Sequence, residues 1–471
     1  MKPTRRDFLA TAGAAAMSSL LPRAASGSDA ASWLDAYRDP AARLIGAALA
    51  DASAWRRLAE LTDTFGHRLS GSRALEDAIQ WAILQMQHDG LEHVRTEPVM
   101  VPRWVRGQES LEIVEPYPSR LVVLGLGNSI GTPRDGIEAD LVVVSTFDEL
   151  ERRAAEAPGR IVLFNAPFVD YGTTVSYRSA GASRAARAGA VACLVRSVGL
   201  DGLRTPHTGM LSYTPDSPKI PAAAVPVEDA LRLERMAARG RVRLRLSMEA
   251  QMLADVESAN VVAEFVGRDR PGEIVVVGGH FDSWDVGTGA IDDGGGCVVA
   301  WEAVRLMKRI DLRPRRTVRV VLYTNEENGM RGGTAYRDQH QADAQNHVLM
   351  IESDGGVFRP RGFGFSGLPR ARETVTAIAS LLAGIQADRV GPSGGGADIG
   401  PMVQAGQVPS MSLDVDTSKY FLYHHTEADT VDKLDPMDRA RCVAVIAVMA
   451  YVVADLPQRL GEPGAPGATG A

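Results

Sequence analysis

Residues 278–296, GGHFDSWDVGTGAIDDGGG, are the most informative stretch of this sequence. The stretch holds one histidine, four aspartates and seven glycines, and it directly follows the run EIVVV at 273–277. One explanation is a solvated loop rich in turn-forming residues. The alternative is a site where an imidazole and several carboxylates surround positive charge. The residues that follow the other apolar runs of the chain favour the alternative.

Side chains of the type that bind metals follow three apolar runs, at 274–277, 317–323 and 347–351. They are His280, Asp282, Glu326, Glu327 and Asp354. In an open α/β sheet, ligands bind at the carboxyl ends of the strands. These side chains are therefore expected to lie at one rim of the predicted sheet. Asp292 and the pair His424–His425 can join them there. Chance places one or two acids at such positions, but it rarely fills every strand end.

This set of side chains fits a pair of divalent metals. Zinc takes imidazole nitrogen and carboxylate oxygen, and two metals roughly 3.5–4 Å apart need a bridging carboxylate with further ligands on each side. Asp292 can bridge. The remaining ligands are then His280 with Asp354 on one side and Glu327 with His425 on the other.

The adjacent Glu326 and Glu327 are predicted to have different roles. Neighbours on a regular strand point to opposite faces, so both can face one site only at a turn. Glu327 then binds metal, while Glu326 stays free to take a proton from the metal-activated water. Asp282, two residues past His280, is placed to orient that imidazole.

From residue 259 onward the sequence alternates between strand, glycine turn, helix and strand. Strands are expected at 274–277, 317–323, 347–351 and 409–415. A helix is expected at 297–310. This alternation predicts an α/β fold, a mostly parallel twisted sheet with helices on both faces. Helices are also expected at 33–62 and 73–87, and a strand at 94–105. The last helix begins at Pro436, with Asp435 as its N-cap.

The predicted domain order has five parts. Residues 1–27 form a signal peptide, 28–106 and 255–457 the two parts of a catalytic domain, 107–254 an inserted α/β domain, and 458–471 a disordered Pro/Gly-rich tail. The N-terminus carries Arg5 and Arg6 ahead of an apolar stretch, which resembles a twin-arginine export signal with cleavage near Ser26. We therefore expect a periplasmic or secreted protein.

Composition excludes several classes of protein. The net charge of −7 and the lack of a basic stripe argue against nucleic acid as a partner. No apolar segment is long enough to span a membrane. The three cysteines, Cys193, Cys297 and Cys442, lie in apolar surroundings and are expected to be buried free thiols. Of two further acids that could touch substrate or face solvent, Glu352 and Asp398, we expect Glu352 to face solvent.

The motifs HFDSWDVGTGAIDDGGG, TNEENG, ESDGG and YHHTEADT, in that order, resemble the di-zinc aminopeptidase and glutamate carboxypeptidase family. A narrower likeness, to the plasma glutamate carboxypeptidase branch of that family, rests on the stretches GHRLSGSRALEDAIQWA, MVPRWVRGQESLEIVEP and GGGADIGPM. The likeness covers nearly the whole chain after the signal peptide. It implies the zinc exopeptidase fold, with an insert that resembles a protease-associated domain. That insert either caps the pocket or mediates a homodimer.

Two zinc ions per chain and a short peptide substrate are implied by the same resemblance. The implied metal ligands are His280, Asp292, Glu327, Asp354 and His425, with Glu326 as general base and Asp282 as the orienting acid. His425 is chosen over His424 because the family phrase falls on residues 425–430. His424 and Tyr423 are the candidates for stabilising the oxyanion. The resemblance also implies a cis peptide bond between Asp292 and Asp293.

The expected activity is hydrolysis of dipeptides or short peptides from one end by metal-activated water. Aminopeptidases, dipeptidases and carboxypeptidases share these ligands, so the sequence leaves the recognised terminus open. Two other functions compete on related scaffolds. A glutaminyl cyclase-like acyltransferase uses one zinc, and a receptor on this scaffold has lost its ligands. Both are disfavoured because all five ligand positions are present.

Overall fold

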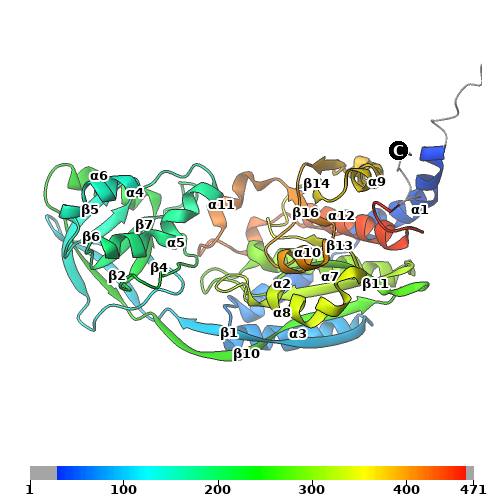
Figure 1. Ribbon diagram of the computed structural model, residues 1–471, viewed down its shortest axis with the longest axis horizontal. Helices are drawn as coiled ribbons and strands as arrows, with labels where there is room; N and C mark the ends of the chain where they lie inside the picture. Colours follow the sequence, from blue (N-terminus) through cyan, green and yellow to red (C-terminus); the bar gives the residue numbers. More distant parts are fainter. Residues whose placement is uncertain (1–28, 463–471) are drawn as a thin grey trace, which may run out of the picture.

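The computed structural model describes residues 29–462, and these form two lobes joined by a long two-stranded ribbon (Figure 1). The predicted signal peptide lies outside the described residues. Of the predicted tail, residues 458–462 are described and they pack onto the larger lobe. Leu460 is buried in its core, and the Arg459 guanidinium lies 3.2 Å from Glu273. The rest of the tail lies outside the described residues.

The larger lobe is built on an eight-stranded sheet. In spatial order its strands are β1 (Glu92–Val105), β10 (Gln251–Phe265), β12 (Arg316–Tyr323), β11 (Arg270–His280), β13 (His347–Glu352), β16 (Ser410–Val415), β14 (Pro360–Ser366) and β15 (Arg389–Gly391). The four central strands, β12, β11, β13 and β16, are parallel, as the sequence predicts. The flanking pairs β1–β10, β10–β12 and β14–β16 are antiparallel.

Helices cover both faces of this sheet. They are α1 (Asp29–Ala50), α2 (Ser53–Phe65), α3 (Arg73–His88), α7 (Gly295–Arg309), α8 (Arg331–His340), α9 (Pro369–Ala379), α10 (Gly400–Gly406) and α12 (Pro436–Asp455). Alternate residues of β11 point to opposite faces. Val275 and Val277 pack in a core that contains α7 and α12 residues, whereas Ile274 and Val276 pack with residues of α8 and α10.

Helix boundaries follow local signals in the sequence. The Asp435 side chain accepts hydrogen bonds from the backbone N–H groups of Met437 and Asp438, which caps α12 as predicted. The helix expected at 33–62 is instead two helices, α1 and α2. Asp51 Oδ1 accepts from the Ser53 N–H at 2.9 Å. This side-chain bond competes with helical backbone bonding and separates the two helices.

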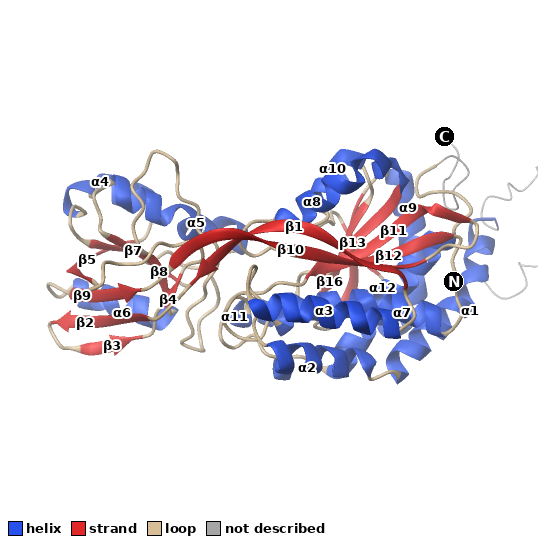
Figure 2. Cartoon of the chain, turned by 90° about the horizontal axis from the view of Figure 1, so that it is seen from below, coloured by secondary structure: helices blue, strands red, loops and turns tan. Residues whose placement is uncertain are grey.

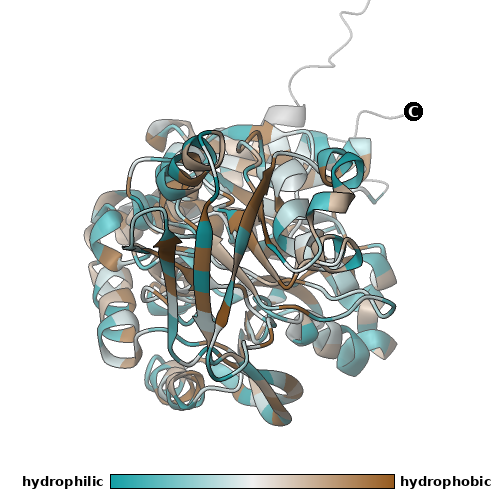
Figure 3. Ribbon diagram, turned by 90° about the vertical axis from the view of Figure 1, so that its left-hand side faces the viewer, coloured by the Kyte–Doolittle hydropathy of each residue, from teal (hydrophilic) through white to brown (hydrophobic). Residues whose placement is uncertain are grey.

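The smaller lobe contains a second eight-stranded sheet built from residues 109–248. Its spatial order is β3 (Ser119–Leu121), β2 (Glu109–Glu115), β9 (Arg243–Met248), β5 (Ile137–Val144), β6 (Ile161–Phe164), β7 (Ala192–Arg196), β8 (Ala222–Val225) and β4 (Leu124–Gly125). Its helices are α4 (Phe147–Arg152), α5 (Tyr171–Arg187) and α6 (Val227–Ala237). Several strands of this lobe carry hydrophobic residues along much of their length (Figure 3).

Strands β1 and β10 connect the lobes. They pair antiparallel over most of their length and form the ribbon that runs from the larger sheet toward the smaller one (Figure 2). A short helix, α11 (Tyr420–Tyr423), extends from the larger lobe toward α5 of the smaller lobe (Figure 1). Among the described residues no helix is both long and apolar enough to cross a bilayer. Cys193, Cys297 and Cys442 are buried and unpaired.

Candidate metal centre and substrate cavity

The predicted ligands meet at the carboxyl ends of the central strands. His280 is the last residue of β11, and Glu326 and Glu327 follow β12 after two residues. Asp354 follows β13, and Asp292 lies in the turn Ala290–Gly294 that leads into α7. Parallel strands end at the same edge of a sheet, which explains why residues far apart in sequence converge here.

Asp292 lies between two sets of side chains. Its Oδ1 is 3.2 Å from His280 Nε2, which is itself 3.4 Å from Asp354 Oδ1. Its Oδ2 is 3.2 Å from His425 Nε2, which is 3.0 Å from Glu327 Oε2. One carboxylate thus faces two histidine–carboxylate pairs.

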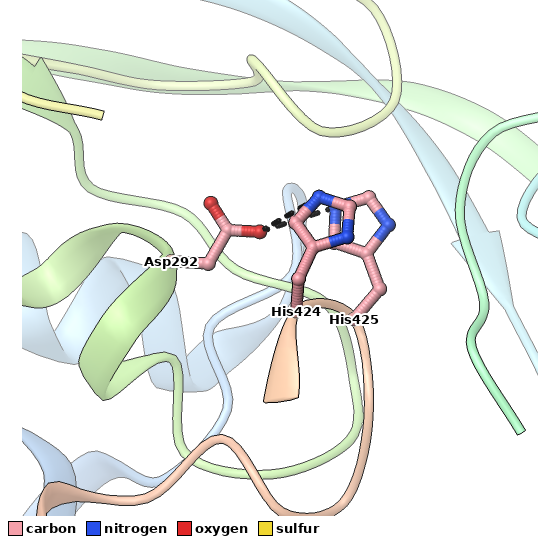
Figure 4. A group of neighbouring side chains, drawn as sticks. All are labelled: Asp292, His424 and His425. Atoms are coloured by element: carbon pink, nitrogen blue, oxygen red, sulfur yellow. Dashed lines mark ion pairs between the residues drawn. The ribbon is translucent and has the colours of Figure 1, made fainter. Parts of the chain in front are cut away.

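His424 also reaches Asp292. Its Nε2 lies 3.5 Å from Asp292 Oδ2, and its ring stacks on that of His425 with centroids 3.5 Å apart. The side chains of His424, His425 and Asp292 point toward one another in Figure 4. Of the two histidines, His425 has the further contact to Glu327, so the two rings differ in their carboxylate partners.

This donor set fits metal ions. Within the described chain, two groups place their ligand atoms within 4.8 Å of one another: Asp292 with His424 and His425, and His280 with Asp292 and Asp354. Both groups share Asp292, whose Oδ2 is buried without a hydrogen-bond donor. Burying several carboxylates together is unfavourable without compensating positive charge, and imidazole with carboxylate is the ligand mixture that zinc prefers.

Glu326 faces the same cavity without joining either ligand group. Burial raises the pKa of its carboxyl well above the usual range, and the neighbouring Asp354 and Glu327 raise it further, against the lowering effect of His280. The pKa of Asp292 is shifted in the opposite direction. Burial raises its pKa, but the neighbouring His280, His425 and His424 outweigh burial and hold the pKa well below the usual range.

The Asp282 atom nearest to His280 is the backbone carbonyl oxygen, whereas the sequence predicts a contact through the carboxylate. His280 Nδ1 is 3.0 Å from the Asp282 backbone carbonyl, whereas the carboxylate Oδ1 is 3.9 Å away, beyond hydrogen-bond range. The carboxylate accepts instead from the backbone N–H groups of Glu326 (3.0 Å) and Glu327 (3.3 Å) and from the Ser70 hydroxyl (3.1 Å). It therefore holds the turn that carries both glutamates, because those N–H groups need an acceptor in the interior.

Two predicted residues lie elsewhere. Tyr423 packs on the hydrophobic core and is absent from the cavity lining, to which α11 contributes Tyr420 and Phe421. Glu352, expected to face solvent, is 1% exposed, and its Oε2 accepts from the Ile399 N–H at 2.9 Å. Glu352 ends β13 inside the sheet, so its side chain points into the protein. Asp398 is also buried.

Two residues that support the glycine-rich stretch were not predicted. Arg68 is fully buried and donates to the carbonyls of Phe281, Thr288 and Gly289. The Asp429 carboxylate accepts from the N–H groups of Ala290, Ile291 and Asp292. Their signal in the sequence is the position of Arg68 in GHRLSG and of Asp429 in YHHTEADT, because both phrases carry the family resemblance. The Asp292–Asp293 peptide bond is cis, as that resemblance implies.

The cavity at this centre has a volume of about 450 Å³ and is lined by both lobes. The larger lobe contributes the ligand side chains and α11. The smaller lobe contributes Tyr171, Val175, Arg178, Ser179 and Met210. A cavity of this size accommodates a small ligand such as a short peptide.

The fold, taken with the known proteins that this chain resembles, is that of a metallo-exopeptidase, a hydrolase. The sequence model for peptidase family M28 matches residues 260–450. The chain is 47% identical to carboxypeptidase Q of Homo sapiens over 86% of each chain, and 47% identical to carboxypeptidase Q of Xenopus laevis over 91% of this chain and 92% of that one. This chain therefore belongs to peptidase family M28.

Solved structures agree with this assignment. The peptidase M28 precursor of Shewanella amazonensis SB2B superposes with a TM-score of 0.87 at 36% identity, over 91% of this chain and 99% of that one. A zinc aminopeptidase of Bacillus subtilis shares the fold, with a TM-score of 0.65 at 18% identity over 85% of this chain and 94% of that one. The narrower resemblance to the plasma glutamate carboxypeptidase branch agrees with the carboxypeptidase Q relatives.

Proposed function

We propose that this chain is an exported exopeptidase that holds two zinc ions and hydrolyses dipeptides or short peptides, with Glu326 as general base. The observation that carries the proposal is the position of Asp292, one oxygen of which faces His280 and the other His425. A carboxylate shared by two histidine–carboxylate pairs is the arrangement that a two-metal site needs.

In this proposal His280 and Asp354 would hold one ion and His425 and Glu327 the other, with Asp292 shared between the two pairs. The zinc aminopeptidase of Bacillus subtilis, which has the same fold, supports the choice of zinc. When bound, zinc polarises the scissile carbonyl and lowers the pKa of the attacking water.

Glu326 moves the proton. Its carboxylate lines the cavity beside both ligand groups, so it can accept a proton from water and deliver it to the leaving amine nitrogen. Burial raises the pKa of Glu326 above the usual range of a carboxyl, the direction that makes a carboxylate a stronger base. Asp282 contributes indirectly, by fixing the backbone on which Glu326 and Glu327 stand.

His424 is the proposed stabiliser of the oxyanion. It lines the cavity, and burial together with the adjacent His425 lowers the pKa of its ring well below the usual value, so the ring is neutral. A neutral imidazole keeps one N–H to donate, and a fixed donor aimed at developing charge favours the transition state. Tyr423 does not line the cavity.

Export through the twin-arginine route and the domain division at residues 107 and 254 belong to the same proposal. The order of basic, apolar and small residues in 1–27 supports export. The second sheet, formed within 109–248, supports an inserted unit that covers the cavity. A homodimer stays a prediction.

One experiment tests the proposed function. The purified chain is analysed for zinc and incubated with a dipeptide, an N-blocked dipeptide, a C-amidated dipeptide and a tetrapeptide, with products followed by mass. We expect two zinc ions per chain and cleavage that depends on one free terminus. One zinc or none, with every peptide intact, would contradict the proposal and favour the cyclase or receptor alternatives.

A further inference from the structure

The backbone of His425 has a conformation that few residues other than glycine adopt. Its φ is 60°, in the left-handed region, where a residue with a Cβ is strained. His425 is also the histidine that faces both Asp292 and Glu327. A side chain held in an unfavourable backbone conformation needs contacts that keep it there, and such contacts come from the smaller lobe.

Thr208 of the smaller lobe holds His425 at two atoms. The Thr208 N–H donates to the His425 carbonyl at 3.0 Å, and the Thr208 carbonyl lies 3.2 Å from His425 Nδ1. Because a carbonyl can only accept, Nδ1 carries the proton and Nε2 keeps its lone pair for a metal ion. One residue thus fixes both the backbone and the tautomer of this histidine.

Thr208 is itself tied to a neighbouring segment of the smaller lobe. It is fully buried, and its hydroxyl donates to the Gly125 carbonyl at 2.8 Å. The Gly127 N–H donates to the Gly209 carbonyl at 3.0 Å, and the Leu211 N–H donates to the Gly127 carbonyl at 3.0 Å. The two segments therefore form one hydrogen-bonded unit behind His425.

Arg106, which directly follows β1, joins this unit to the larger lobe. Its Nε lies 2.8 Å from Asp285 Oδ2, and its Nη2 contacts the other oxygen of the same carboxylate. Asp285 belongs to the glycine-rich stretch 278–296 of the larger lobe. On the other side, Arg106 Nη1 donates to the Gly125 carbonyl, and Nη2 lies 3.4 Å from the Thr208 hydroxyl. A bidentate arginine–carboxylate pair is strong and directional, so it fixes the unit in place.

Trp284, the neighbour of Asp285, enters the smaller lobe at the same point. Its ring packs in the core of that lobe, and its centroid lies 5.6 Å from that of His425, with the two rings at 61°. Such edge-to-face pairs are favourable. A Cβ added at Gly127 would lie 2.0 Å from the Trp284 ring, so the ring needs glycine there. The two lobes are therefore joined directly beside His425.

We propose that Arg106 is a positioning residue of the metal centre. Through Thr208 it holds His425 in its ligating conformation, so that one of the two metal positions depends on the docked smaller lobe. This inference rests on the proposed function, because it assumes that His425 binds an ion. The other pair, His280 and Asp354, stands at strand ends of the larger sheet, so its geometry does not need the smaller lobe.

A general contribution to stability is the competing explanation, because breaking any buried ion pair destabilises a protein. Arg57→Gln is the matched control. The Arg57 side chain is 10% exposed, as is that of Arg106, and its Nη2 lies 2.8 Å from Asp89. Arg57 stands on α2 of the larger lobe. A general loss of stability lowers Tm, whereas a loss of positioning weakens the binding of one zinc ion selectively.

The test withdraws zinc from loaded wild type, Arg106→Gln and Arg57→Gln by competition with a chelator, and records Tm for each protein. Wild type is expected to release two ions. In Arg106→Gln one ion is bound about 10–100-fold more weakly, the usual cost of losing a contact behind a ligand, while the other stays within about threefold of wild type. Arg57→Gln lowers Tm and keeps both affinities.

His425→Ala identifies the ion concerned. This variant is expected to keep one ion, and adding Arg106→Gln to it leaves the affinity for that ion unchanged, because the route from Arg106 ends at His425. Weaker binding of the remaining ion in the double variant would overturn positioning and assign Arg106 to general stability. Equal weakening of both ions in Arg106→Gln, or no weakening of either, would do the same.

Asp285→Asn supplies an independent variant. It keeps the shape of the carboxylate and removes its charge, so it should reproduce the selective weakening, and it decides the question if Arg106→Gln does not fold. Wild-type affinity for both ions in a folded Asp285→Asn would count against the inference. Failure of wild type to bind two zinc ions would instead contradict the proposed function itself.

Discussion

The Asp429 carboxylate accepts a hydrogen bond from the backbone N–H of Asp292 at 3.2 Å, across 137 residues of sequence. The same carboxylate accepts from the two preceding N–H groups, of Ala290 and Ile291. The turn that aims the shared carboxylate at both histidine pairs is therefore held by a residue from the loop that also carries His424 and His425. Ligands from distant parts of the chain are thus positioned as one unit.

Asp429→Ala is expected to weaken zinc binding without unfolding the protein. Three buried N–H groups lose their acceptor, and the turn that carries Asp292 loosens. Loss of such a supporting contact typically costs about 10–100-fold in metal affinity. Competition with a chelator measures the change, and Asp432→Ala, at an exposed aspartate three residues later, is the control. Unchanged zinc affinity in Asp429→Ala would contradict the supporting role.

Glu326→Gln is expected to keep both metals and lose about 10²–10⁴-fold in kcat, because an amide cannot accept the proton from water. Zinc analysis and steady-state kinetics on the same preparation check this. Turnover within tenfold of wild type in the zinc-loaded variant would exclude Glu326 as the base.

Substitutions of the adjacent His424 and His425 are expected to have different effects on zinc content and kcat. His425→Ala should lose one zinc ion per chain, since His425 contacts both Asp292 and Glu327. His424→Gln should keep the metals and lose about 10²–10³-fold in kcat, the usual effect of removing one oxyanion donor. Zinc counting separates the two variants. If His424→Gln is the variant that loses zinc, the assignment of His425 as the ligand is wrong.

Acid is expected to destabilise the larger lobe through His347, away from the metal centre. Its Nε2 accepts from the Tyr336 hydroxyl at 2.9 Å, and Tyr336 in turn accepts from Arg319. Burial, with the nearby Arg319 charge, lowers the pKa of His347 from the usual 6.5 to about 4. Between these values the unfolded chain binds a proton that the folded chain does not, so stability falls as pH drops.

For wild type this loss amounts to roughly 2 kcal/mol at about pH 5 relative to neutral pH. His347→Gln keeps an acceptor for Tyr336 and does not titrate, so its Tm should fall less on acidification. Thermal unfolding of both proteins at several pH values checks this. Parallel Tm curves for the two proteins would show that His347 does not carry the acid sensitivity.

Export is tested by Arg5→Lys combined with Arg6→Lys. The twin-arginine route requires the arginine pair, so the variant should stay in the cytoplasm of a bacterial host while its fold and activity are kept. Cell fractionation with an activity assay measures the distribution. Normal export of the lysine variant would contradict the twin-arginine route.

Much of the larger lobe follows from local patterns in the sequence. Apolar runs of strand length predicted β12, β13 and β16, and the Asp435–Pro436 signal predicted the start of α12. The convergence of the predicted ligand side chains followed as well, because carboxylates and histidines stand directly after strands, and parallel strands end at one edge. The prediction that Glu352 faces solvent was wrong, and the hydrogen-bond partners of the Asp282 carboxylate were not predicted, because burial and hydrogen bonding depend on neighbours distant in sequence.

By itself the sequence determined the α/β sheet, the residue types at the strand ends and the family, since these depend on residue type, order and spacing. Only the tertiary structure decided which distant residues contact and position them. It brought Asp429 under the Asp292 turn and placed Arg178 of the smaller lobe beside His425, 247 residues later. Such contacts join segments through packing of whole elements, and no local pattern in either segment encodes its partner.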